Sequence, residues 1–264
     1  MFEPIDISDT VNNALKNLLD GPTAAIGGTI SDFLSIFQTK IHYFSEKKKL
    51  QYKQDFVTFL NLASAKISTI PAENLIEPQI QILGAISEDI TYCINCEELR
   101  EMFASLLSNS CNCKYLTIAH PSFSKTLKCM SPYDAVFLKK IAAERNNAAE
   151  TVEAAQYIAS RNNFKEKIIL HECIVFTDDY FSDFNMQSLS ISALKQLGVI
   201  EYTQPEPSPL ERFTEIEYFK FLQKQYREKD FIVTPYRVEV YLTPYGNSFL
   251  TACSALPLSN ECIL

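Results

Sequence analysis

The stretch DDYFSDFNMQSLSISALKQLGVIEYT, residues 178–203, decides how the C-terminal half of this chain is expected to fold. Its apolar residues recur at helical spacing up to Leu197, and Gly198 then supplies a residue that readily ends a helix. The β-prone run VIEY follows at once. The stretch therefore predicts a helix, a glycine stop and a strand in immediate succession.

The segments around this stretch also alternate between helix and strand. KIILHECIVF (167–176) is β-rich, whereas TEIEYFKFLQKQYRE (214–228) has helical periodicity. DFIVTPYRVEVYLT (230–243) alternates like a strand, and PYGNSFLTAC (244–253) closes as a helix. This order resembles a winged-helix arrangement. NNAAETVEAAQYIASRNN (146–163) is compatible with either a mobile connector or a short helix.

The N-terminal half is predicted to be helical. A leader helix occupies residues 1–20, and apolar residues then recur at helical spacing from Ile26 as far as Ala63. Further helices are expected to begin at three later points: Pro71, Glu97 and Pro132. We therefore expect a mainly α protein with a helical domain over residues 21–128 and a winged-helix-like α+β domain over residues 129–264.

The composition is that of a globular protein with a substantial core. Hydrophobic residues make up 47% of the 264 residues, and the net charge of −8 argues against a general nucleic-acid-binding surface. The opening MFEPIDISDT lacks the basic start of a secretory signal, and no apolar run approaches the ~20 residues of a membrane span. We expect a cytoplasmic protein with reduced cysteines and no cofactor.

The run GPTAAIGGTISDFLSIF, residues 21–37, is predicted to form a helix with only small residues along one face. Small residues recur every three or four positions, which permits close approach of a second helical backbone. A phosphate-binding loop is disfavoured, because no strand precedes the run and no Lys-Ser/Thr pair follows it. The predicted interaction helix is centred on these residues: Gly27, Gly28, Ile30, Ser31, Phe33 and Phe37. An alternative is that this helix leaves the core and acts on a membrane when the protein is triggered.

The most basic part of the chain is SEKKKLQYK, residues 45–53. A row of lysines on a helix is suited to a membrane surface or an acidic partner, although a solvated helix face is the simpler interpretation. The basic patch consists of four lysines: Lys47, Lys48, Lys49 and Lys53.

Four cysteines are candidate ligands for a zinc ion. Cys93 and Cys96 precede, and Cys111 and Cys113 follow, a predicted helix that is about 20 Å long at 1.5 Å per residue. That length carries the two pairs to opposite ends, and the second pair is spaced more tightly than is usual for zinc ligands. Reduced thiols without a metal are therefore favoured.

The three histidines do not form a recognisable catalytic arrangement with a nucleophile. His42 shares a predicted helix with aromatic residues, and His120 precedes a proline, which favours an extended backbone there. His171 lies beside Glu172 in a β-rich run, and this pair would suit acid–base chemistry only within a pocket. A hydrolase or nuclease site assembled from Glu172, Asp178 and Asp179 stays an alternative.

Several motifs in a fixed order resemble the Abi-alpha (abortive infection alpha) family of bacterial proteins. After the glycine-bearing helix and the Pro71 helix come EELREMFASLLSNS (97–110), the segment HPSF (120–123), the SPYDA helix start (131–135) and LTPYGNSF (242–249). The motif residues are His120, Pro121, Phe123, Ser131, Pro132, Asp134, Pro244 and Gly246. The resemblance implies a helical N-terminal part, a winged-helix-like C-terminal part and a role in defence against phage. It supplies no catalytic residues.

We expect a non-enzymatic sensor or effector that acts through contacts with a protein partner, either another protein or a second copy of the chain. The main rival is a DNA-binding transcription regulator. Residues 131–264 contain 13 basic and 18 acidic residues, and the helix in the recognition position, about 183–197, contributes one cation, Lys195. Because DNA readers need several phosphate contacts, nucleic acid is the less favoured partner.

Overall fold

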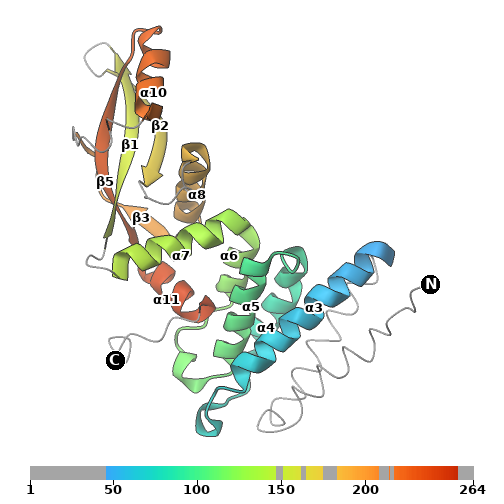
Figure 1. The fold of residues 1–264 in the computed structure, drawn as a ribbon. Helices are drawn as coiled ribbons and strands as arrows, with labels where there is room; N and C mark the ends of the chain where they lie inside the picture. The colour runs from blue at the N-terminus through green and yellow to red at the C-terminus, as the bar shows by residue number, and fades with distance from the viewer. Residues whose placement is uncertain are drawn as a thin grey trace. The chain divides into compact units, whose positions relative to one another are not determined.

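The structure is a computed structural model that describes residues 46–146, 151–161, 165–174, 183–207, 214 and 217–254 (Figure 1). The chain divides into two compact units, one of residues 1–132 with 247–264 and the other of residues 133–246. The protein is mainly helical, with an antiparallel sheet in its C-terminal part, as predicted. The predicted helices of residues 1–45 lie outside the described residues, and the assignment of 21–128 and 129–264 as domains stays a prediction.

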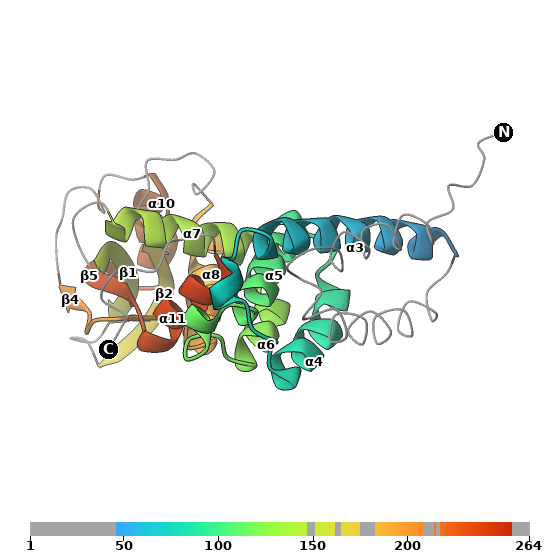
Figure 2. The same ribbon diagram turned by 90° about the horizontal axis from the view of Figure 1, so that it is seen from below.

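The first unit is built from helices. α5 packs against α3, α4 and α6, and Figures 1 and 2 show it among these three helices. Among the described residues, the helical elements that lie wholly in this unit are α3 (Glu46–Ile67), η2 (Ala72–Asn74), α4 (Ile80–Asp89), η3 (Ile90–Tyr92), α5 (Glu97–Ser110), η4 (Cys113–Tyr115) and α6 (Ser122–Cys129).

α5 begins and ends close to where its sequence pattern predicts. Glu97 and Glu98 occupy its first turn, where negative charge favours the helix dipole. Its apolar face is buried, with Phe103 and Leu106 fully covered. Ser105 and Ser108 are buried as well, because neighbouring helices cover more than one side of α5.

The prediction of a continuous helix that begins at Pro71 is wrong. Residues 72–74 form a single 3₁₀ turn, and the α-helix begins only at Ile80. Pro78 explains the interruption, since a proline lacks an amide donor and disfavours helical backbone in the residue before it. The intervening chain is held by a bridge between Leu75 and Asn112.

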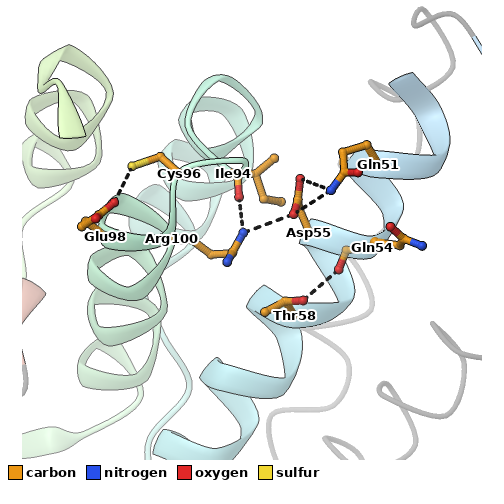
Figure 3. A network of polar contacts seen from close by, with 8 residues as sticks. All are labelled: Gln51, Gln54, Asp55, Thr58, Ile94, Cys96, Glu98 and Arg100. Carbon is orange, nitrogen blue, oxygen red and sulfur yellow. Dashed lines mark hydrogen bonds and ion pairs between the residues drawn. The ribbon is translucent and has the colours of Figure 1, made fainter. Parts of the chain in front are cut away.

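A largely buried ion pair joins α3 to α5. The Arg100 guanidinium lies 3.3 Å from an Asp55 carboxylate oxygen and donates a 2.9 Å hydrogen bond to the carbonyl of Ile94 (Figure 3). The side chains of Arg100 and Asp55 are only 12% and 14% exposed. Around this pair, α3 buries an apolar stripe that includes Phe56, Phe59 and Leu60.

The second unit combines a sheet with helices. Its described strands run in the order β2-β1-β5-β3, with β4 also paired to β5, and they pair antiparallel. Its elements are α7 (Pro132–Asn146), β1 (Thr151–Arg161), β2 (Glu166–Ile174), α8 (Phe184–Gln196), β3 (Ile200–Tyr202), β4 (Glu206–Pro207), α10 (Glu217–Arg227) and β5 (Ile232–Leu242), and α11 (Pro244–Cys253) starts in this unit and ends in the first.

The prediction of a mobile connector or a short helix for residues 146–163 is wrong, because residues 151–161 form the strand β1. This strand pairs with β2 on one side and β5 on the other, and residues 154–160 are all buried. Alanine, glutamate and glutamine favour helices locally, but pairing on both edges and burial on both faces override that preference. The other predicted elements of this half, α8, β3, α10, β5 and α11, are present.

α10 covers one face of the sheet. Tyr157 and Ala159 of β1 form a buried cluster with Phe219 and Leu222 of α10. The rings of Tyr157 and Phe219 lie 5.6 Å apart. Alternate residues of β1 reach this cluster because successive side chains on a strand point to opposite faces.

The end of α8 and the start of α11 are joined through backbone atoms. Asp183 caps α8 by accepting from the amides of Asn185 and Met186, and Gly198 ends it with a φ of 72°. The Thr243 hydroxyl donates to the Gly198 carbonyl at 2.6 Å and accepts from the Gly246 amide at 2.9 Å. A Cβ atom at position 246 would lie 1.9 Å from the carbonyl oxygen of Val199.

None of the helices within the described ranges is both long enough and apolar enough to cross a bilayer.

Replacing Gly246 with alanine is expected to lower the free energy of unfolding by at least about 2 kcal/mol, because the new methyl group meets backbone that cannot rotate away. Gly84→Ala is the matched control. It lies in α4 with open space around its Cβ position, so helix propensity should raise stability by up to about 1 kcal/mol. Urea unfolding followed by circular dichroism measures both, and equal effects would contradict the close approach.

Asp55→Asn is expected to destabilise the protein by about 1–3 kcal/mol, since the Arg100 guanidinium then stays largely buried without its counter-charge. The control is Gln54→Ala, an exposed change on the same helix that should stay within about 0.5 kcal/mol. Chemical unfolding of both variants tests this, and a change no larger in Asp55→Asn than in the control would contradict it.

Candidate functional site

Three of the family-motif residues lie at the start of α6. The His120 ring nitrogen Nδ1 accepts from the Ser122 amide at 3.2 Å, and it lies 2.7 Å from the Ser122 hydroxyl. Pro121 precedes the helix directly. Phe123 is buried and meets Phe249 of α11 edge to face, with ring centroids 5.5 Å apart. This motif therefore fixes a helix start and a core contact in the first unit.

The remaining motif residues lie at the starts of α7 and α11. Asp134 is buried and accepts a short hydrogen bond from Ser190 of α8, which joins two helices of the second unit. Ser131, Pro132 and Pro244 are exposed, and Gly246 makes the close backbone approach described above. The buried members of the motifs thus have structural contacts, which explains their residue types without a catalytic role.

The four candidate zinc cysteines are separated by α5. Cys93 and Cys96 lie before its first turn, and Cys111 and Cys113 lie after its last. Their sulfur atoms have different partners: the Cys96 thiol donates to Glu98 at 3.2 Å, and that of Cys111 to the Leu107 carbonyl at 3.4 Å. Among the described residues there is no group of three or more His, Cys, Asp or Glu side chains placed to hold a metal ion.

Burial also keeps several of the cysteine thiols of this chain protonated. It raises the pKa of Cys93 to about 11 and that of Cys111 to about 12, and it raises the pKa of the fully buried Cys253. Because the thiolate is the metal ligand and the nucleophile, these cysteines are poor candidates for either role at neutral pH.

His171 and Glu172 do not line a common site. The His171 ring packs against Tyr218, with centroids 5.4 Å apart, and burial lowers its pKa. Glu172 instead accepts hydrogen bonds from Gln156 at 2.8 Å and from Tyr202 at 2.7 Å. Adjacent residues on a strand point to opposite faces, so this pair cannot act on one substrate. Asp178 and Asp179, the other acids of the hydrolase alternative, lie outside the described residues, as does His42.

The predicted interaction helix, Gly27 to Phe37, also lies outside the described residues. Of the basic patch, Lys47, Lys48 and Lys49 belong to the first turn of α3, and Lys53 is exposed on the same helix. The structure therefore leaves the roles of the glycine helix and this patch as predictions.

A surface that the sequence reading missed lies between α10 and β5. Two adjoining hollows of about 770 and 510 Å³ share Lys220, Gln223 and Val233. We call this surface the α10–β5 groove, and the described residues that line its larger hollow are Lys220, Gln223, Lys224, Arg227, Glu228, Phe231, Ile232 and Val233.

One wall of the α10–β5 groove is a row of cations. Lys220, Lys224 and Arg227 follow one another at spacings of four and three residues, so they share one side of α10. All three are exposed, and none has an ion pair with another described residue. Glu228 is the one carboxylate among the described lining residues of the larger hollow.

The lining of the groove also includes apolar side chains. Ile232, at the start of β5, is 70% exposed, and Phe231 lies beside it with its ring 4.8 Å beneath the Arg161 guanidinium. Phe221 of α10 is a further large apolar residue on this part of the molecule, at 59% exposed. The spacing KxxxKxxR within FKFLQKQYR was the available sequence signal. This spacing is a weaker signal than the denser lysine run at residues 47–49.

The described side chains of this groove combine positive charge with apolar surface. Unpaired cations beside exposed aromatic and aliphatic side chains are typical of surfaces that bind an acidic, partly apolar partner.

Thiol labelling with N-ethylmaleimide at neutral pH is expected to modify the exposed Cys113 and Cys129 and to spare Cys111 and Cys253. The buried pair is protected because burial both excludes the reagent and keeps the thiols protonated. Peptide mass spectrometry reads each site, and unfolding in urea should expose all of them. Rapid labelling of Cys111 in the native protein would contradict this, as would protection of Cys113 by added zinc.

The comparisons with known proteins identify a family. No curated protein and no solved structure matches the chain significantly. Residues 47–253 match the model of the abortive infection alpha family, which covers most of the chain and contains every motif residue from His120 to Gly246. The chain is therefore a member of the abortive infection alpha family, as its motifs predicted.

Proposed function

We propose that this protein is a non-enzymatic effector of abortive-infection-type phage defence, which acts by binding a protein partner through the α10–β5 groove. Membership of the abortive infection alpha family suggests the defence role. The observation that carries the mechanism is the row of Lys220, Lys224 and Arg227 beside exposed apolar residues, in a chain whose net charge is −8.

The charge and apolar character of the groove favour one class of partner. An acidic segment with apolar side chains would pair its carboxylates with the cation row and cover Ile232 and Phe231. Cations steer such a partner and set its register, while the apolar contacts hold it. Partner binding also fits the motif residues, whose buried members have structural contacts within the described residues.

A DNA-binding role is less well supported. The order of α8, β3, β5 and α11 fits a winged-helix-like unit with β1 and β2 added to the sheet, which would place α8 in the recognition position. Its one cation, Lys195, is already bound: its ammonium lies 2.9 Å from Glu201 and 3.6 Å from the Tyr202 ring centroid. The hydrogen bond from Lys195 lowers the pKa of Glu201, which keeps this carboxylate charged. Such a helix offers little to phosphates.

The membrane alternative rests on Gly27, Gly28 and their neighbours, which the structure does not describe. The hydrolase alternative would need Glu172 as a free acid or base, but this carboxylate accepts hydrogen bonds from Gln156 and Tyr202. Contact with a protein is thus the mechanism that the described residues support best.

The triple variant Lys220→Glu/Lys224→Glu/Arg227→Glu is expected to reduce phage protection at least about tenfold, because it replaces attraction by repulsion along the whole cation row. Plaque counts on bacteria that express each form measure protection, and thermal unfolding checks that the variant is folded. The control reverses two exposed lysines elsewhere, Lys114 and Lys125, and should protect like the natural sequence.

Full protection by the folded groove variant would overturn the proposed contact. A gel shift at low salt with genomic fragments addresses the DNA alternative. Binding that is lost in Lys195→Ala but kept in the groove variant would favour the regulator over the contact mechanism.

A further inference from the structure

A second hollow, in the first unit, has a different chemical character. It measures about 280 Å³ and lies between the end of α3, one face of α5 and the turn that follows α5. We call it the α3–α5 pocket, and its chemically distinctive lining residues are Lys66, Ser105, Ser108, Asn109, Asn112 and Tyr115.

The α5 side of this pocket is a polar stripe. Ser105, Ser108 and Asn109 are spaced to share one face of α5, and Asn112 continues this polar lining in the turn after the helix. Ser105 and Ser108 are only 3% and 4% exposed. A buried helical face is normally apolar, because a buried hydroxyl without a partner is destabilising.

Part of the hydrogen-bonding capacity of this stripe is unused. The Ser105 hydroxyl donates to the Glu101 carbonyl, and the Asn109 amide nitrogen donates to the Ala252 carbonyl at 2.9 Å. In contrast, the Ser108 hydroxyl and the Asn112 amide nitrogen have no hydrogen bond to another described residue. These groups are available to a molecule in the pocket.

The other walls supply positive charge and further donors. Lys66, in the last turn of α3, has no ion pair with another described residue, and the described lining of the pocket contains no carboxylate. Burial raises the pKa of Tyr115, so its hydroxyl stays a donor at neutral pH. One ammonium group surrounded by hydroxyl and amide donors is the arrangement that binds an oxyanion.

We propose that the α3–α5 pocket binds a small polar molecule that carries one oxyanion, with Lys66 and Tyr115 on the anion and the Ser108 and Asn112 side chains on its hydroxyl groups. The volume is at the lower limit of ligand pockets, which run from about 300 to 1,000 Å³. A sugar monophosphate is small enough for a pocket of this volume, whereas a dinucleotide is too large. This site is separate in sequence and chemistry from the α10–β5 groove, so it does not depend on the proposed function.

Isothermal titration of the full chain with ribose 5-phosphate, inorganic phosphate and ribose tests the proposal. We expect ribose 5-phosphate to bind one site per chain, inorganic phosphate to bind more weakly, and ribose not to bind measurably. Lys66→Met should weaken binding of ribose 5-phosphate about tenfold or more, because it removes a charge-assisted contact. Lys53→Met, on the exposed side of the same helix, is the matched control and should bind like the natural sequence.

A second measurement does not depend on how well the variants fold. In the natural chain with ¹³C-methylated lysines, ribose 5-phosphate should shift the NMR signal of Lys66 and leave that of Lys53 unchanged. Tyr115→Phe, which removes one oxygen atom, should weaken binding without changing the thermal midpoint.

Two results would overturn the assignment: no binding by either phosphate, or equal affinity in folded Lys66→Met and in the natural sequence. If inorganic phosphate bound as tightly as ribose 5-phosphate, the polar stripe would not be contacting the sugar hydroxyl groups. That part of the proposal would then be wrong. The groove triple variant should keep its affinity for ribose 5-phosphate, so a failure here and a failure of the proposed function are distinguishable.

Discussion

The C-terminal half of the molecule depends on one backbone contact, the approach of Gly246 to the carbonyl of Val199. No side chain fits between them, since even a methyl group at position 246 would overlap the oxygen. The Thr243 amide donates to this same carbonyl at 3.1 Å, and the Thr243 hydroxyl bonds to the backbone on both sides of the junction. The end of α8, the end of β5 and the start of α11 are thereby held together, and the pairing of β3 with β5 follows.

Most buried or half-buried charges in the described residues are compensated by close partners. Asp55 pairs with Arg100, and Asp89 receives Lys128 and Ser124, each at 2.9 Å. Donation to Asp89 raises the pKa of Lys128, which keeps this cation charged. Groups engaged in this way stabilise the fold but have little capacity left for a ligand.

Two places in the described residues set cations without ion pairs beside other groups that can bind a ligand, and both proposals rest on them. The cations of the α10–β5 groove stand beside exposed apolar side chains, and Lys66 stands beside hydroxyl and amide groups that lack partners. The first combination is suited to a protein surface, where apolar contact supplies affinity. The second is suited to a small polar molecule, where each hydrogen bond fixes orientation. The described residues thus contain two chemically different candidate binding sites.

The sequence by itself determined the helical character, the helices α8, α10 and α11, the strands β3 and β5 and the family, because these depend on local signals such as apolar periodicity, Gly198 and the ordered motifs. It did not determine β1, whose alanine-rich composition favours a helix until pairing with β2 and β5 is known. Nor did it reveal the groove and the pocket. Lys220 and Ile232 line one hollow, and Lys66 and Ser108 line another, only after their helices and strands pack together, and a local pattern does not predict that packing.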